Sequence, residues 1–374
     1  MSTLEQFQAT FDVEPGYLNW ASFGPLSVTA RAEGAADLEV LGSGRPSSLD
    51  LIIARAESAR EHIAAVLGVD AEGVTLQQAT THGLMQAAFG VTGGIVLSRS
   101  EYPSLPIAVT RAADALHAAW PQWIEPEALH HGWVTPEAIE GALTPETTAV
   151  AVSLVDFHSG YRADLAAIRE VIGDRLLIVD AIQGFGVVEA PYAQADVVCG
   201  NGYKWLRAGR GTGFAWFGPR ALERLTPVFS GLTGVDVSYP FESVSAPVRA
   251  ARAFTVSPFD PIAHARHAAA VAEVREAGVA EIEGAVAPIM TRLRAMAEAA
   301  DIPAITPEEP ARRAGILTLQ PHPADAAPLA AALANAGVAS TARMGAIRLS
   351  AHAGTDDRSL DMVAEAFAAV AAAR

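Results

Sequence analysis

Two ionisable side chains follow short apolar runs of the sequence and could act together. Asp180 ends the run LLIVD, and Lys204 comes shortly after the run ADVVCG. Ligands of open α/β sheets gather at the carboxyl ends of strands, and burial of a lysine favours the neutral amine that attacks carbonyl carbons. A lysine that forms a Schiff base and a carboxylate that keeps a pyridine nitrogen protonated are what pyridoxal phosphate needs. Taken alone, Asp180 could equally well cap the following turn, and Lys204 could equally well be a snorkelling side chain. The two residues together favour imine chemistry.

Two other segments suit anionic groups. Thr80 and Thr81 lie between a predicted strand (73–78) and a predicted helix (83–90). Free N–H groups at a helix N-terminus and two hydroxyls suit a phosphate, although such a pair is more often a plain cap. Arg348 lies in the apolar segment AIRLSAH, where a guanidinium needs a planar anionic partner. A structural salt bridge is the alternative for Arg348.

These segments together resemble the class V aminotransferase family of fold-type I pyridoxal-phosphate enzymes. That family includes aminotransferases, cysteine desulfurases, kynureninase and isopenicillin N epimerase. Its Asp-x-Ala-Gln motif is matched by Asp180-Ala181-Ile182-Gln183, and its lysine segment is matched by Asn201-Gly202-Tyr203-Lys204-Trp205. The resemblance covers nearly the whole chain and implies pyridoxal 5'-phosphate as the cofactor.

The resemblance also implies a role for each site residue. Lys204 would form the Schiff base, Asp180 would hold the ring nitrogen, and Gln183 would bond the phenolic oxygen of the cofactor. Tyr102 would stack on the cofactor face, with an ordinary loop anchor as the alternative, and Arg348 would grip the substrate α-carboxylate. The residues expected to contact the phosphate are Thr80, Thr81, Asn201 and Tyr203.

The elements that must position these side chains alternate along the chain. Apolar runs of four to eight residues recur between stretches with helical spacing, which is typical of helices packed around a largely parallel sheet. The sequence predicts an α/β fold of the fold-type I transferase kind. We expect an N-terminal arm (1–15), a large cofactor-binding domain with a mostly parallel sheet flanked by helices (16–245), and a small α+β C-terminal domain (246–374). The predicted strands are 73–78, 94–98, 148–155, 176–180, 195–200, 211–217 and 315–321.

Some positions depart from the family pattern. Leu154 stands where many relatives place Asn or His beside the cofactor ring, with Asp156 or His158 as substitutes. Ser257-Pro258 stands where relatives carry a Gly-Thr pair that reaches the phosphate across a dimer interface. Substrate specificity is expected to depend on loops such as 42–50 and 230–245.

The residues leave the reaction open. Reprotonation on the cofactor gives transamination, loss of a β-substituent gives a lyase, and reprotonation at Cα gives an epimerase. We rank an aminotransferase first, ahead of a β-lyase (carbon–sulfur or kynureninase-like) or an epimerase. The segment 339–347 has no thiol where the family's cysteine desulfurases carry one, so the sequence predicts that the chain is not a cysteine desulfurase. Retention of Lys204, Asp180, Thr81 and Arg348 disfavours a non-catalytic regulatory protein.

Composition limits the partners. With 26 Lys+Arg against 42 Asp+Glu, the net charge of −16 disfavours binding to nucleic acid and to anionic membranes. No apolar run approaches the ~20 residues of a membrane span.

One cysteine, Cys199, excludes an internal disulfide and is expected in the core. His264 and His267 lack a third ligand, so we expect no metal site. We expect a cytoplasmic protein, and the family resemblance implies a homodimer whose small-molecule substrate is an amino acid.

Overall fold

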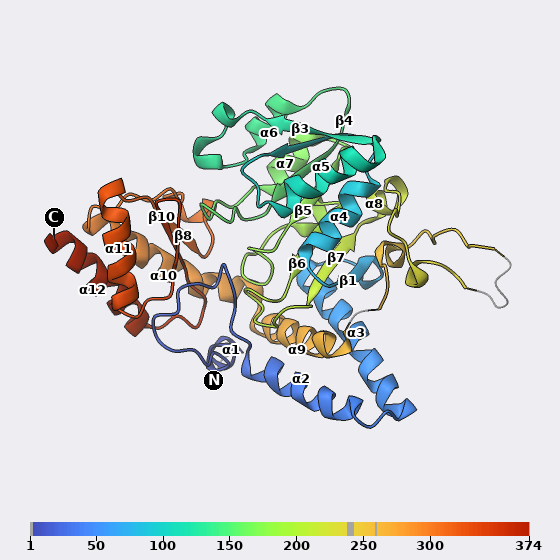
Figure 1. The fold of residues 1–374 in the computed structure, drawn as a ribbon, viewed down its shortest axis with the longest axis horizontal. Coiled ribbons are helices and arrows are strands. Elements are labelled where there is room, and N and C mark those ends of the chain that lie inside the picture. The colour runs from blue at the N-terminus through green and yellow to red at the C-terminus, as the bar shows by residue number, and fades with distance from the viewer. Residues whose placement is uncertain (1–2, 238–242, 259, 374) are drawn as a thin grey trace.

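A seven-stranded sheet forms the centre of the larger part of the molecule (Figure 1). The computed structural model describes residues 3–237, 243–258 and 260–373. Within these residues the strand order is β1-β7-β6-β5-β4-β2-β3, and the α/β fold predicted from the sequence is confirmed. The strands are β1 (Val74–Gln77), β2 (Gly93–Ser98), β3 (Ala119–Ile124), β4 (Thr147–Ser153), β5 (Leu176–Asp180), β6 (Val197–Asn201) and β7 (Gly213–Phe217).

Most strands of this sheet point in one direction. β3, β2, β4, β5 and β6 pair in parallel, whereas β7 is antiparallel to both β6 and β1. β1 therefore runs in the same direction as β6, and its carboxyl end lies at the same edge of the sheet. Thr80, Asp180 and Asn201 lie at or just beyond such strand ends. Residues far apart in sequence thus share the edge at which ligands of α/β sheets bind.

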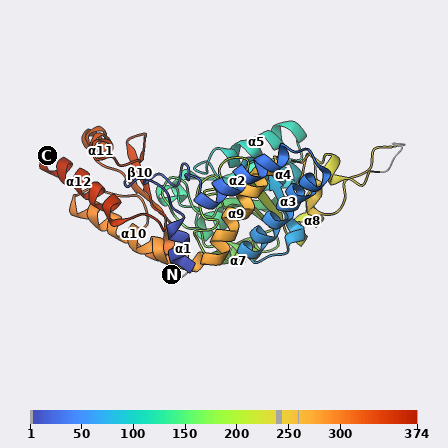
Figure 2. The same ribbon diagram turned by 90° about the horizontal axis from the view of Figure 1, so that it is seen from below.

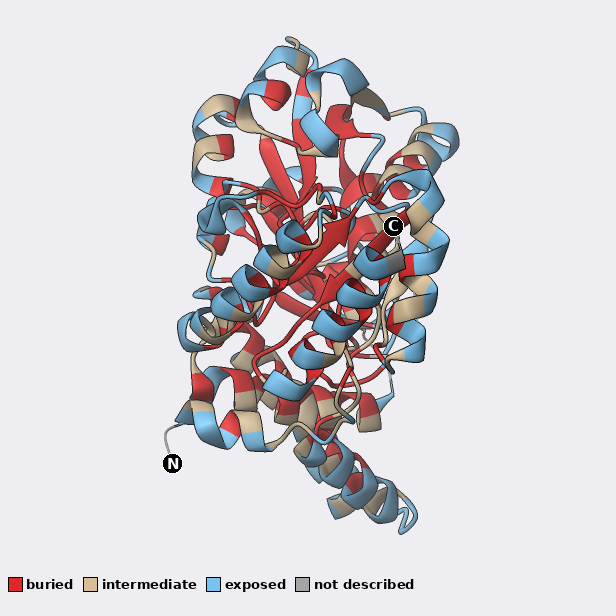
Figure 3. Cartoon of the chain, turned by 90° about the vertical axis from the view of Figure 1, so that its left-hand side faces the viewer, coloured by how far each residue is buried: buried red, intermediate tan, exposed pale blue. Residues whose placement is uncertain are grey.

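Helices cover both faces of the sheet. Alternate residues of β4 face opposite ways, since Ala149 and Ala151 pack in one apolar cluster while Val150 and Val152 pack in the other. Figure 3 shows the buried strands between helices whose outer surfaces are exposed. The helices of this part are α2 (Val28–Leu41), α3 (Pro46–Leu67), α4 (Thr80–Gly90), α5 (Ser104–Leu116), α6 (Pro136–Ala142), α7 (Leu165–Ile172), α8 (Pro219–Arg224) and α9 (Pro261–Ala277).

The C-terminal part contains a second, antiparallel sheet. Its strands are β8 (Ile316–Leu319), β9 (Thr341–Arg343) and β10 (Ala346–Ser350), in the order β8-β10-β9. Its helices are α10 (Val279–Ala299), α11 (Pro323–Asn335) and α12 (Asp357–Ala373). Figure 2 shows α10, α11, α12 and β10 gathered at one end of the molecule. Whereas α10 packs against α12 and β8, α9 packs against α2 and α3.

The N-terminal segment crosses to this C-terminal sheet. After α1 (Thr3–Ala9), Asn19 forms a parallel bridge with Ser350 at the end of β10, and the Leu18 carbonyl accepts a hydrogen bond of 2.7 Å from the Ser350 N–H. The segment then continues over the loop that carries Lys204, because the Gly24 N–H donates to the Tyr203 carbonyl at 2.9 Å. Residues 17–25 therefore belong to the surroundings of the predicted site.

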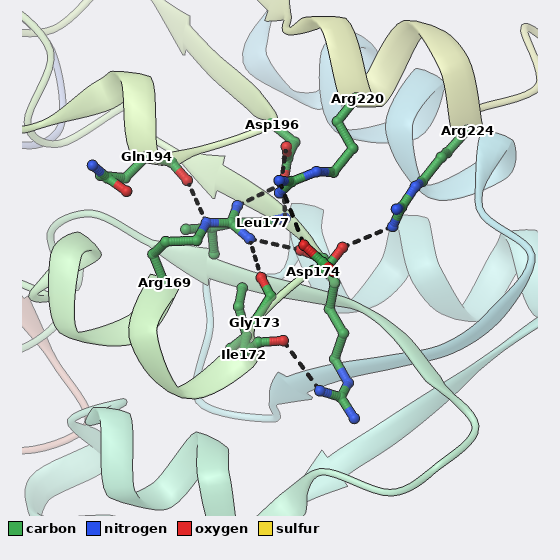
Figure 4. A network of polar contacts seen from close by, with 10 residues as sticks. Arg169, Ile172, Gly173, Asp174, Leu177, Gln194, Asp196, Arg220 and Arg224 are labelled. Carbon is green, nitrogen blue, oxygen red and sulfur yellow. Dashed lines mark hydrogen bonds and ion pairs between the residues drawn. The ribbon is translucent and has the colours of Figure 1, made fainter.

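The buried carboxylate of Asp196 lies at the amino ends of β5 and β6, opposite the edge of the sheet that holds the predicted site residues (Figure 4). Asp196, just before β6, accepts hydrogen bonds from the Leu177 N–H of β5 at 2.8 Å and from the Arg169 guanidinium at 2.6 Å. Arg220 of α8 donates to the other carboxylate oxygen at 3.3 Å. This network ties the amino ends of β5 and β6 together. It thereby holds the register of the two strands that carry Asp180 and Asn201.

Domain boundaries and surface loops remain predictions. The predicted boundaries at residues 15/16 and 245/246 have no independent test, and residues 238–242 of the predicted specificity loop lie outside the described residues. Among the described helices, none combines the length and apolar character that a membrane span requires.

Candidate functional site

A cavity of about 260 Å³ lies at the carboxyl edge of the large sheet. Three parts of the chain form it: the N-terminal segment, the large sheet with its loops, and the β9–β10 hairpin. A groove beside α1, α3 and α9 is larger, at about 400 Å³, but none of the predicted site residues lines it. The residues that line the smaller cavity are Ala21, Ser22, Tyr102, Phe157, Gln183, Tyr203, Lys204, Arg210, Thr341, Arg343, Ala346 and Arg348.

Lys204 is held in a tight loop after β6. It is the only lysine of the 374-residue chain, and it is buried. The Arg207 N–H donates to the Lys204 carbonyl at 3.0 Å, and the Gly202 N–H donates to the Thr212 carbonyl at 2.8 Å. A Cβ at Gly24 would overlap the Lys204 carbonyl oxygen, so only glycine lets the N-terminal segment cross here.

Burial perturbs both members of the predicted pair. Desolvation lowers the pKa of Lys204, Asp180 opposes this lowering, and Arg348 and Arg210 add to it. Desolvation likewise raises the pKa of Asp180, against the hydrogen bond of 3.0 Å from the Ile182 N–H and the charge of Lys204. Lys204 therefore reaches its neutral, nucleophilic form more readily than an exposed lysine does.

A second buried carboxyl lies next to Asp180. Glu101 accepts hydrogen bonds from the Ser153 N–H at 3.1 Å and from the Ser153 hydroxyl, and Ser153 pairs with Asp180 across β4 and β5. Burial raises the pKa of Glu101 to about 8, the bonds from Ser153 lower it, and the charges of Asp156 and Asp180 raise it further. Glu101 is therefore mostly uncharged at neutral pH. The sequence motifs predict no role for Glu101, although it directly precedes Tyr102.

Aromatic rings flank the lysine. The ring centroids of Tyr102 and Tyr203 each lie 5.6 Å from Lys204 Nζ. Phe157 contacts Tyr102 edge to face at 5.2 Å, and the Arg210 guanidinium lies 4.8 Å from the Tyr203 ring centroid. Phe157 and Arg210 were not predicted, because their loops carry no motif that marks them.

Gln183 is oriented by its neighbours. Its Nε2 donates to the Ala21 carbonyl at 3.0 Å, and its Oε1 accepts from Trp205 Nε1 at 2.9 Å. Gln183 lines the cavity, and its second amide N–H makes no hydrogen bond to another described residue. This arrangement suits the predicted contact to a cofactor oxygen.

The hydroxyls at the start of α4 differ in their partners. Thr80 Oγ1 is buried and has no hydrogen-bond partner among the described residues. Thr81 Oγ1 instead bonds Ser104 Oγ at 2.9 Å, and Asn201 Oδ1 accepts from the Tyr203 N–H at 2.7 Å. A buried hydroxyl without a partner is costly, so Thr80 indicates that an acceptor belongs at this helix N-terminus.

Arg348 lies across the cavity on β10. Its two Nη atoms donate to the Phe157 carbonyl and to Ser22 Oγ, each at 2.7 Å, whereas its Nε is buried without a partner. Ser22 itself is not a predicted site residue, although its segment, 17–25, resembles a substrate-side loop of epimerase-like and lyase-like members of the family. The guanidinium is held in place and retains a donor for an anion.

Leu154 and Asp156, which depart from the family pattern, have structural partners. Leu154 is buried in the core, and its N–H donates to the Asp180 carbonyl at 2.9 Å. Asp156 Oδ1 accepts from the N–H groups of His158 and Ser159, and the His158 side chain is exposed. Cys199 is fully buried, as predicted, and a Cβ at Gly83 would approach its Sγ to 2.8 Å.

Comparison with known proteins identifies the family. The profile of the Aminotransferase class-V family matches residues 43–348. The chain belongs to the class-V aminotransferase family. The recognition made from the sequence motifs is thereby confirmed. A comparison with curated proteins gives no match.

Solved structures of low sequence identity share the fold. A cysteine desulfurase from Thermococcus onnurineus NA1 has a TM-score of 0.83 and 17% identity, over 96% of this chain and 95% of that chain. A complex of the cystine C–S lyase C-DES with its reaction product, cysteine persulfide, has a TM-score of 0.83 and 19% identity, over 96% and 98%. The Escherichia coli cysteine desulfurase CsdA has a TM-score of 0.79 and 18% identity, over 98% of both chains.

One sequence-based prediction is corrected by these matches. The chain was predicted not to be a cysteine desulfurase, yet cysteine desulfurases and a C–S lyase match almost its entire length. The missing thiol in 339–347 concerns only the acceptor of the sulfur after the carbon–sulfur bond breaks. It does not bear on whether the lysine site can break that bond, so the exclusion was wrong.

The cofactor of this class V enzyme is pyridoxal 5'-phosphate, and the site fits it. The partnerless Thr80 hydroxyl lies at a helix N-terminus, which suits a phosphate.

Proposed function

We propose that this chain is a pyridoxal-phosphate-dependent carbon–sulfur lyase that acts on a small amino acid of the cysteine or cystine type. The observation that carries the proposal is that the chain's only lysine is buried at the carboxyl edge of the sheet, with Arg348 across the cavity. The choice of carbon–sulfur cleavage is supported by the activities named for the matching solved structures. The aminotransferase ranked first from sequence is the alternative outcome of the assay.

The proposed roles of the residues follow from their positions. When bound, pyridoxal phosphate supplies a carbonyl carbon that condenses with amines and a ring that accepts the electrons of a bond broken at Cα. Lys204 would hold that carbon covalently as a Schiff base. Asp180 would keep a proton on the ring nitrogen, Gln183 would bond the phenolic oxygen, and Tyr102 would cover one face of the ring. The phosphate would be bound by Thr80, Thr81, Asn201 and Tyr203.

The substrate would be bound through its carboxylate. Arg348 would form a charge-assisted hydrogen bond to the α-carboxylate through its free Nε, which orients the Cα–H bond. Released Lys204 would take the Cα proton as a neutral amine. The electron pair of the Cα–H bond would form a Cα=Cβ double bond while the Cβ–S bond breaks and its electron pair leaves on sulfur. Hydrolysis of the released enamine by water would then give pyruvate and ammonia. Cys199 is buried in the core, so its thiol would not contact the departing sulfur.

The assay follows all products together. We would incubate the holoenzyme with cysteine or cystine without a keto-acid acceptor, and measure pyruvate, ammonia and the sulfur product. We expect pyruvate and ammonia in equal amounts, and no product from Lys204→Ala. Amino-group transfer that requires an added keto acid, without sulfur release, would replace the proposal by transamination.

We also propose that the enzyme is a homodimer, as the family resemblance implies, and that it is cytoplasmic. Multi-angle light scattering of the holoenzyme should give twice the mass of the 38.9 kDa chain. A monomer with bound cofactor and full activity would contradict this part of the proposal.

A further inference from the structure

The β9–β10 hairpin presents two arginines to the same cavity. In this antiparallel pair Thr341 lies opposite Arg348, and Arg343 lies opposite Ala346. Residues opposite one another, and residues two apart along a strand, share one face of a hairpin. All four therefore lie on one face, and all four line the cavity.

The two guanidiniums differ in their surroundings. Arg348 is partly buried and held by Phe157 and Ser22, whereas Arg343 is exposed next to the turn at Met344. No hydrogen bond or ion pair of the described residues involves the Arg343 side chain. Diagonal neighbours on a hairpin lie about 7–8 Å apart, so the two positive charges repel unless an anion lies near them. Consistent with this, the charge of Arg343 helps to lower the pKa of Arg348, an effect secondary to burial.

One of the cationic side chains that line the cavity has no anion assigned to it. Lys204, Arg210, Arg343 and Arg348 line the cavity, and no carboxylate does. Lys204 is committed to the cofactor and Arg348 to the substrate α-carboxylate. Arg210 stacks on Tyr203, on the side where the phosphate is proposed to bind. Arg343, one diagonal step outward from Arg348, is the cation that remains.

We infer that Arg343 determines specificity by binding a second carboxylate, at the far end of the substrate side chain. The substrate class is then an α-amino acid whose sulfur substituent itself ends in a carboxylate, as in a disulfide-linked amino acid. That the substrate contains sulfur rests on the proposed function. That the substrate carries a second carboxylate is inferred from the geometry of the hairpin alone.

The test uses two amino acids of equal chain length without a sulfur leaving group, 2-aminoadipate and norleucine. Their dissociation constants for the holoenzyme would be measured by calorimetry and by the change in cofactor absorbance, without an amino acceptor. We expect 2-aminoadipate to bind about fivefold more tightly than norleucine, because an ion pair with an exposed arginine contributes at most roughly this much. Arg343→Gln should remove this preference and leave the binding of norleucine unchanged.

The matched control is Arg358→Gln, which removes an exposed arginine of α12 outside the cavity. This variant should retain the preference. The inference is overturned if the native enzyme shows no preference, if Arg343→Gln retains it, or if Arg343→Gln weakens both ligands equally. Failure of sulfur release from cysteine and cystine, with the preference intact, would refute the lyase proposal and leave the role of Arg343 standing.

Discussion

Replacing Glu101 by glutamine should stabilise the protein increasingly as the pH rises. Glu101 is buried, and its pKa is raised from an ordinary value of 4.5 to about 8. Between these pH values the folded protein keeps a proton that the unfolded chain releases. The folded state then binds more protons, so its stability falls as the pH increases. The amide of Glu101→Gln keeps an acceptor for the Ser153 N–H and can donate its own N–H to Ser153 Oγ in place of the second bond, and it does not titrate.

The expected magnitude follows from the two pKa values. Each pH unit above 4.5 costs the native protein about 1.4 kcal/mol, until the folded carboxyl itself ionises near pH 8. Glu101→Gln should therefore exceed the native protein in unfolding free energy by about 2 kcal/mol at pH 6 and by about 3 kcal/mol at pH 7. Below pH 4.5 the difference vanishes.

Urea denaturation of the cofactor-free protein from pH 6 to pH 8.5 measures this difference. The matched control is Glu39→Gln, which makes the same change of a carboxylate to an amide at an exposed position of α2. A difference for Glu101→Gln that stays constant between pH 6 and pH 8 would refute the argument. So would a variant less stable than the native protein throughout the range.

Three further substitutions test separate contacts of the site. Thr80→Val should weaken cofactor binding about tenfold in an equilibrium titration, while Thr80→Ser retains affinity, because only the valine lacks the hydroxyl; equal affinities would remove Thr80 from the phosphate site. Gly24→Ala should abolish the visible absorption of the holoenzyme, since its Cβ overlaps the Lys204 carbonyl, whereas Gly141→Ala, which meets no atom within 4 Å, should leave it unchanged. Cys199→Ala should lower stability by about 1 kcal/mol and preserve sulfur release; loss of sulfur release in a folded, cofactor-loaded variant would implicate the thiol.

The main strands of the large sheet could be predicted because their apolar runs are continuous. LLIVD and ADVVCG are buried on both faces and need no alternation, and strands β5 and β6 lie within or close to the predicted ranges. β3 was missed because AWPQWI contains Pro121 and polar Gln122. A proline is tolerated there because β3 is the edge strand, a fact that only the topology supplies.

The site residues could be predicted where an ionisable side chain ends or follows a predicted strand, as Asp180 and Lys204 do. A further signal was available but unused: the chain keeps a single lysine although it has 26 Lys+Arg in total. Ser22 and Arg343 could not be predicted, because they enter the cavity from the N-terminal segment and from the β9–β10 hairpin. The bridge between Asn19 and Ser350 brings the N-terminal segment to β10, and the pairing of Arg343 with Ala346 belongs to the hairpin.

The single lysine makes the central claim directly measurable. Borohydride reduction of the holoenzyme, followed by intact-mass and peptide mass spectrometry, should give one reduced cofactor adduct per chain, located on Lys204. Native protein without an adduct at Lys204, or Lys204→Ala with the same absorption band and the same activity, would contradict the account.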